Sequence, residues 1–247
     1  MKQGTDKSDF TQGSIPQNII RMAVPMTAAV LINALYSIVD RIYLGHIPGA
    51  GSYALTGIGL AFPIITIITA FQNLFGNGGA PLFAMASGKG DKQLAARYLQ
   101  NAAFMLIAVG ILLTAVAYAV KQPVLWLIGA SEVTFPYANE YLNVYLIGTI
   151  FVMISVGLNP YINAQGYART GMLTVMIGAV INIVLDPLFI FVFKMGVKGA
   201  AIATIIAQFV SAVWVLKFLF IILKVLDKLL IYRNQTYLQD GMSPSLL

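Results

Sequence analysis

The sequence predicts an all-α, polytopic membrane protein with six transmembrane helices. Of its 247 residues, 59% are hydrophobic and only 10% are charged, whereas soluble folds carry roughly a quarter charged residues. Six mostly apolar stretches reach the length of about 20 residues that a helix needs to cross a bilayer. Lysines and arginines lie between these stretches, as topology signals do. The expected surroundings are therefore the lipid bilayer.

The predicted spans are six in number and follow one another with short polar connections. They cover 17–45, 54–80, 95–120, 135–157, 168–193 and 199–223. They give a segment 1–14, a six-helix transmembrane lobe 15–223 and a tail 224–247.

Local signals refine the ends of these elements. Ser14, Pro16 and Gln17 have a capping-box spacing with proline in the first turn, so the first helix is expected to begin there. Asp91 is expected to cap the third helix in the same way. From residue 221 lysines interleave with Leu and Ile, which predicts an interfacial amphipathic helix, and 239–247 is predicted to be disordered.

The positive charges predict the orientation. With the amino terminus inside, eleven of the 15 lysines and arginines fall in segments that face the cytoplasm. Positive residues are retained on the cytoplasmic side of membrane proteins. We therefore expect a multi-pass protein of the cell membrane with both termini cytoplasmic.

Several functional classes find no support in the residues. The chain has no cysteine and one histidine, His46, so thiolate metal sites, cysteine nucleophiles and a histidine pair for zinc are excluded. No Ser/His/Asp set and no phosphate-binding loop occurs. The basic residues do not gather into a nucleic-acid surface. We predict that the protein is not an enzyme, needs no cofactor and binds no nucleic acid.

Two carboxylates lie inside predicted spans, where an ionisable group is costly and usually faces a cavity. Counted from the outer helix ends, Asp40 is ~8 Å deep and Asp186 is ~12 Å deep. Thr204 and Tyr141 lie at ~9 Å by the same count. Four oxygen-bearing side chains from four helices are therefore expected to share one layer of the outer leaflet.

Helical spacing places further polar groups beside these carboxylates. Asn33, Tyr36 and Asp40 are spaced at i, i+3 and i+7 on the first span, and Asn182 and Asp186 at i and i+4 on the fifth. Such spacings put side chains on one helix face.

Two chemical uses of this layer remain open. Pro187 removes a backbone donor and loosens the carbonyl of Ile183, so carboxylate, amide, hydroxyl and carbonyl oxygens would be available to a hard cation such as Na⁺. The same two carboxylates could instead carry a proton. A structural alternative is that Asp40 is an interfacial charge and that the asparagines, with Thr204, only join helices.

Three segments resemble the multidrug and toxin extrusion (MATE) family of secondary transporters. They are Val39–Gly45 (VDRIYLG), Asn163–Thr170 (NAQGYART) and Asn182–Phe191 (NIVLDPLFIF), the last followed by Gly196–Thr204 (GVKGAAIAT). The third is the most specific, because it joins an intramembrane Asn/Asp pair to a small-residue hairpin. The resemblance covers roughly residues 15–217.

The resemblance implies export of cationic and amphipathic drugs in exchange for Na⁺ or H⁺ by twelve helices in two lobes of six. It matches four positions to the family's cation site: Asp40, Asn182, Asp186 and Thr204. It matches four more to the neighbouring cavity: Asn33, Tyr36, Tyr141 and Asn159. No other metal site is expected beyond a possible Na⁺ at the cation site.

The chain differs from the family in offering one lobe, and its last thirty or so residues do not resemble the family's linker to a seventh helix. Alternating access at a lobe interface requires a second lobe. The expected partners are therefore small organic cations and a second six-helix lobe or a second copy. The alternatives are a flippase or metabolite exporter of related fold, and a truncated, non-transporting membrane subunit.

Overall fold

The computed structural model describes the backbone of residues 14–239 and the side chains of residues 14–220. Six of its helices, or runs of helices, are long and apolar enough to cross a membrane. Within the described range the chain is all helix and connecting turns. The predicted fold class, a six-span membrane protein, is confirmed.

The spans are built from the following elements. They are α1 (Ile15–Gly45), α2 (Gly51–Gly88), α3 (Lys92–Leu127), α4 (Phe135–Tyr145), the 3₁₀ turn η1 (Leu146–Gly148), α5 (Thr149–Gly157), α6 (Asn159–Ala164), α7 (Ala168–Pro187), the π-helical segment η2 (Leu188–Val192) and α8 (Gly196–Gln239).

One of the two predicted helix caps forms in the structure. The Asp91 side chain accepts a hydrogen bond from the Leu94 backbone N–H at 2.9 Å, so its predicted cap on α3 is confirmed. Ser14 is the N-cap of α1, with proline in the first turn, but its side chain makes no capping bond. The predicted capping box is therefore wrong, although the helix begins where it was placed.

Several predicted boundaries need correction. The predicted connection 81–94 is helical up to Gly88, α3 runs on to Leu127, and α6 occupies part of the predicted loop 158–167. Hydropathy locates the apolar centre of a helix, whereas backbone hydrogen bonding carries the helix on into the polar boundary.

The sixth helix also differs from its prediction. It does not stop at 223 but continues to Gln239 as one helix, because neither glycine nor proline interrupts 221–239. Its placement along the membrane surface stays a prediction. The predicted segment 1–14, Ser14 apart, and the predicted disorder of 240–247 lie outside the described residues.

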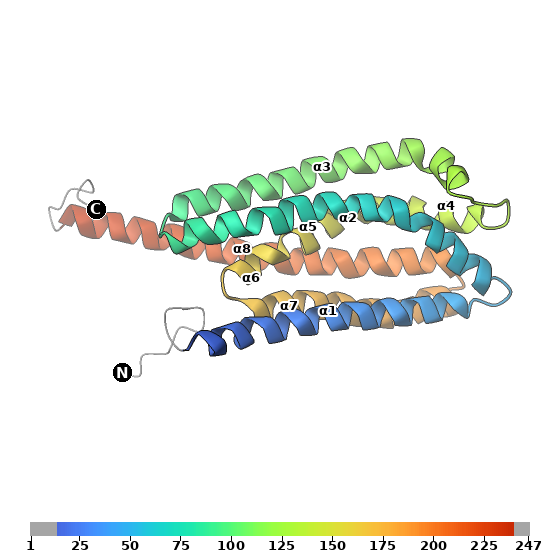
Figure 1. The fold of residues 1–247 in the computed structure, drawn as a ribbon, viewed down its shortest axis with the longest axis horizontal. Helices are drawn as coiled ribbons and strands as arrows, with labels where there is room; N and C mark the ends of the chain where they lie inside the picture. Colours follow the sequence, from blue (N-terminus) through green and yellow to red (C-terminus); the bar gives the residue numbers. More distant parts are fainter. Residues whose placement is uncertain (1–13, 240–247) are drawn as a thin grey trace.

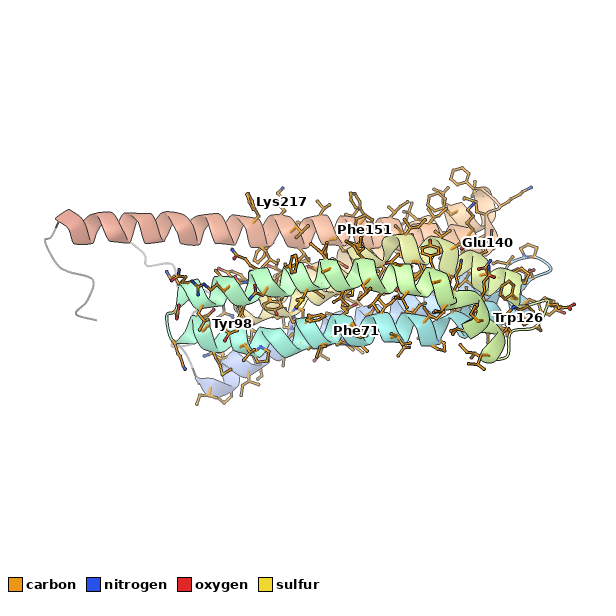
Figure 2. All side chains as sticks on the ribbon, turned by 90° about the horizontal axis from the view of Figure 1, so that it is seen from above. Phe71, Tyr98, Trp126, Glu140, Phe151 and Lys217 are labelled. Carbon is orange, nitrogen blue, oxygen red and sulfur yellow. The ribbon has the colours of Figure 1, made fainter. Side chains whose placement is uncertain are left out.

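Figure 1 shows α1 and α7 along one side of the bundle, α2 and α3 along the other, and α8 between them. Helix α1 packs chiefly against α7, and α2 packs against α3, while α8 contacts both α5 and α7. The starting end of α1 and the final end of α8 lie at the same end of the bundle. Tyr98 lies toward that end, and Trp126 and Glu140 lie at the opposite end (Figure 2).

Small residues allow a close backbone contact between α2 and α5. A Cβ atom added to Gly76 of α2 would lie 2.6 Å from the carbonyl oxygen of Gly157 on α5. Beside this contact the Tyr161 hydroxyl donates to the Phe75 carbonyl at 2.8 Å. Such close backbone approach is typical of helix packing in lipid, where apolar side chains alone give little driving force.

The end of α7 changes its hydrogen-bond pattern at Pro187. Proline has no N–H to donate, and the next five residues form a π-helical turn in which Phe193 N–H donates to the Leu188 carbonyl at 2.9 Å. Such π segments are rare and are often found at functional sites. Here the segment directly follows Asp186.

We expect Gly76→Ala to destabilise the bundle, because the new Cβ must displace the Gly157 backbone, and overpacking costs about 1–3 kcal/mol. Gly78→Ala is the matched control, since its Cβ would meet nothing within 4 Å. The measurement is the temperature at which the detergent-solubilised protein loses its monodisperse gel-filtration peak. Equal temperatures for the two variants would contradict this packing.

Candidate cation site and polar cavity

The site is centred on Asp186, which is fully buried on α7. One turn earlier, the Asn182 side-chain N–H₂ donates to Asp186 Oδ1 at 3.4 Å and to Thr204 Oγ1 at 3.3 Å. The i, i+4 spacing on α7 brings the first two together, and the contact of α7 with α8 brings in Thr204. One amide thus joins two helices beside a carboxylate.

Asp40 brings the second carboxylate from α1. The carboxyl groups of Asp40 and Asp186 interact electrostatically with each other. Three oxygens of the cluster, Asp40 Oδ1, Asp186 Oδ2 and Asn182 Oδ1, are buried without a hydrogen-bond partner. Burial of such acceptors is costly unless they are paired. A group of unpaired oxygens suits a proton or a hard cation.

Aromatic hydroxyls border the carboxylates. Tyr36 and Tyr141 are electrostatic neighbours of both Asp40 and Asp186. The Tyr141 ring stacks on Tyr145, with centroids 5.7 Å apart and planes 17° apart. Both of these tyrosines are buried. The two carboxylates therefore lie against polar hydroxyls as well as against apolar side chains.

Arg41 follows Asp40 directly, but it is a poor partner for that carboxylate, since adjacent helical residues point about 100° apart. Its guanidinium lies over the ring of Phe62 on α2, 5.1 Å from the ring centroid. The arginine still acts on Asp40 as a nearby positive charge, but its side chain is directed toward α2.

A polar cavity of about 80 Å³ adjoins the cluster. Five of the predicted residues line this cavity with amide or hydroxyl groups: Asn33, Tyr36, Asn159, Asn182 and Thr204. Tyr141 lies beside the carboxylates and not in the lining of this cavity. The structure thus brings the eight predicted residues to one region, while their roles in binding stay predictions.

Four polar lining residues escaped the sequence analysis: Ser155, Thr174, Gln208 and Ser211. The Ser155 hydroxyl donates to Gln208 Oε1 at 2.5 Å, and the Ser211 hydroxyl donates to the Thr174 carbonyl at 3.2 Å. The sequence did contain a signal for two of these residues, because Gln208 and Ser211 follow Thr204 at i+4 and i+7 and so lie on the same helix face. Serine and threonine are common at helix contacts in membranes, so their presence alone did not single them out.

The ligands available here are oxygens. Among the described residues, no group of three or more His, Cys, Asp or Glu side chains could hold a metal ion. The two carboxylates, the Asn182 amide and the Thr204 hydroxyl therefore offer oxygen ligands. Oxygen ligands of these kinds suit a hard cation.

Comparisons with known proteins agree on one family. The MatE family model matches residues 25–188. The "Probable multidrug resistance protein YpnP" of Bacillus subtilis is 27% identical over 200 residues, which are 81% of this chain and 44% of that protein. The "Multidrug export protein MepA" of Staphylococcus haemolyticus is 26% identical over 206 residues, which are 83% of this chain and 45% of that protein.

Solved structures give the same result. The outward-facing structure of a multidrug resistance MATE family transporter matches with a TM-score of 0.81 and 27% identity, over 87% of this chain and 47% of that one. A transporter of the MOP superfamily from Pyrococcus furiosus matches with a TM-score of 0.80 and 27% identity, again over 87% and 47%. The chain spans about half the length of the curated relatives it matches.

We expect the coupling cation to stabilise the purified chain. A cation at ten times its dissociation constant adds about 1.4 kcal/mol to the free energy of unfolding. Replacing choline chloride by NaCl, or lowering the pH, should therefore raise the unfolding temperature in detergent, and the condition that responds identifies the ion.

The response should vanish in Asp186→Asn and persist in Asp91→Asn, a matched change at an exposed capping aspartate. If Asp186→Asn responded as strongly as the unaltered chain, the site would not lie at Asp186.

Proposed function

Because this chain belongs to the MatE family, we propose that it is one lobe of a secondary transporter that exports small organic cations in exchange for Na⁺ or H⁺. The observation that carries the proposal is the fully buried Asp186 with its unpaired oxygen, joined by Asn182 to Thr204 beside the carboxylate of Asp40. Ionisable residues inside membrane spans usually mark ion or substrate pathways. The cavity next to the cluster, of about 80 Å³, has room for a small cation with a few waters.

In the proposed cycle, a cation that enters from outside binds between the two carboxylates and offsets one of their two negative charges. Two negative charges close together in a low dielectric repel strongly, and a bound cation lowers this repulsion. Since α1 is held chiefly by α7, a change between Asp40 and Asp186 acts directly on the packing of α1. The altered α1 releases the drug outward. The membrane potential contributes about 2.3 kcal/mol per charge per 100 mV.

Export at a lobe interface requires a second lobe, and we propose a partner lobe of six helices or a second copy of this chain. Helix α1 presents large apolar side chains to the outside of the bundle, among them Val30, Leu35 and Ile38. Either lipid or a partner lobe is compatible with this surface.

A second candidate is a flippase or metabolite exporter of the same fold. It draws support from the Pyrococcus furiosus relative, for which reverse polarity of the binding pocket suggests a different function. The cavity of this chain is lined by neutral amides and hydroxyls, which would accept cargo other than cations. The remaining alternative is a membrane subunit that binds an ion without transport. Export is the activity named for the Staphylococcus haemolyticus relative.

We also propose that both termini are cytoplasmic, on the strength of the positive-charge bias. The α2–α3 and α6–α7 turns would then be cytoplasmic, and the α1–α2 and α3–α4 connections would face outward.

The export proposal predicts ethidium efflux from cells that produce the 247-residue chain, at a rate above the empty vector. Asp186→Asn should lower the rate at least about tenfold, because the carboxylate that takes up the cation is lost. Asp91→Asn serves as the matched control and should export like the unaltered chain. Efflux that is undiminished in Asp186→Asn would refute the mechanism, and no efflux from an inserted chain would refute transport by this chain alone.

The orientation proposal predicts opposite labelling of two single cysteines in this cysteine-free chain. Ser87→Cys lies at the exposed end of α2 and Glu132→Cys in the exposed α3–α4 loop. A membrane-impermeant maleimide should label Glu132→Cys on intact cells, and Ser87→Cys only after the cells are opened. The reverse pattern would show that the termini face outward.

A further inference from the structure

Helix α7 carries a buried stripe that runs well beyond the carboxylate cluster. Its members recur every three or four residues and are all buried: Gly171, Thr174, Gly178, Asn182 and Asp186. This spacing places them on one helix face, over a length of ~22 Å. Opposite them, Thr204, Gln208 and Ser211 recur on α8 at i, i+4 and i+7 and line the polar cavity. The seam between α7 and α8 therefore carries polar side chains from both helices.

The two glycines of the stripe let neighbouring side chains approach the α7 backbone closely. A Cβ atom at Gly178 would lie 2.9 Å from the Ser211 hydroxyl. A Cβ atom at Gly171 would lie 2.1 Å from Asn163 Oδ1 and 2.8 Å from Asn159 Oδ1. The absence of a side chain at Gly171 thus leaves two amide oxygens facing the α7 backbone.

These two asparagines form a cradle at the end of α7 that adjoins the α6–α7 turn. Asn159 donates its side-chain N–H₂ to the Gly171 carbonyl at 3.1 Å, which fixes its oxygen toward the cradle. The side-chain oxygens of Asn159 and Asn163 are both buried, and neither has a hydrogen-bond partner. Asn159 also lines the cavity that reaches Asn182 and Thr204.

The unpaired atoms along the seam are all of one kind. Asn159 Oδ1, Asn163 Oδ1, Asn182 Oδ1 and Asp186 Oδ2 are acceptors. An arrangement rich in acceptors and poor in donors attracts water hydrogens and cations and repels anions. Successive turns of a helix rise about 5.4 Å, a gap that one water molecule can bridge with two hydrogen bonds of about 2.8 Å.

We propose that the α7–α8 seam is a cation pathway from Asp186 to the α6–α7 turn, and that Asn159 and Asn163 over Gly171 form a second monovalent cation site at its mouth. The inference rests on the proposed cation site at Asp186. It supplies the exit by which a cation taken up at the carboxylates leaves on the opposite side of the membrane. The cavity volume of about 80 Å³ admits several waters at about 10–15 Å³ each, so a cation moves along the seam partly hydrated.

Silver ion is a suitable probe, because Ag⁺ is a monovalent cation that replaces the proton of a thiol. The chain has no cysteine, so any introduced thiol is the only one present. Ser211→Cys places that thiol in the seam. Ala212→Cys is the matched control, since it lies on the same helix at the same depth but is buried in the apolar core. Both rates are measured in sealed vesicles, as the thiol left for a maleimide after denaturation.

With Ag⁺ on the side that carries the α6–α7 turn, Ser211→Cys should react at least about tenfold faster than Ala212→Cys. Adding Gly171→Ala to Ser211→Cys should slow the reaction at least about tenfold, because its Cβ displaces both amide oxygens. Adding Gly78→Ala instead should leave the rate unchanged, since its Cβ meets open space. If Gly171→Ala prevents insertion, Asn163→Leu tests the same cradle and should slow the reaction equally.

The inference is overturned if Ser211→Cys reacts no faster than Ala212→Cys from that side, or if closing the cradle leaves its rate unchanged. The assay measures ion access and not export, so the two proposals fail separately. Rapid Ag⁺ access without any Asp186-dependent efflux would refute export by this chain and leave the pathway in place. Asp186-dependent efflux without rapid Ag⁺ access would refute the pathway and leave export by this chain in place.

Discussion

The structure depends on the cost of placing a carboxylate in the membrane. Asp186 is fully buried, and an ionised group at that depth is expensive unless polar atoms surround it. Asn182 on the same helix, Thr204 on α8 and the tyrosines beside Asp40 supply such polar atoms. The aspartates are thus not additions to a finished bundle. They dictate which faces of α1, α7 and α8 meet, and they make those faces polar.

The polar faces of α7 and α8 must also pack against each other without large apolar side chains. A polar seam cannot be closed by Leu and Ile, so backbone approach must supply the contact, and small residues make such approach possible. Gly178 lies against Ser211, and Gly76 lies against the backbone of Gly157. Helix α2 contributes no residue to the cavity lining, whereas the α7–α8 contact borders the cavity. Small residues thus allow close packing at the α2–α5 contact and border the cavity at the α7–α8 contact.

Helix α1 is attached to the lobe mainly through one neighbour. This attachment connects the architecture to the proposed transport. Helix α1 leans chiefly on α7 and contacts the rest of the lobe little, and it contributes Asn33, Tyr36 and Asp40 to the cavity and cluster. A change of charge between Asp40 and Asp186 therefore acts on a helix that is held chiefly by one neighbour, α7. The π-helical turn after Pro187 adds a second adaptable element on the other side of the carboxylates.

The sequence by itself determined the class of protein, the six spans and the two aspartates, because hydropathy and the cost of a buried charge are local properties. Helical spacing also placed Asn182 beside Asp186, since both lie on one helix. Only the tertiary structure decided which helices face one another. It joined Thr204 to Asn182 across α7 and α8, turned Arg41 toward Phe62, and brought Asn159 and Asn163 over Gly171. Contacts between helices depend on rotation and depth, which periodicity within one helix does not fix.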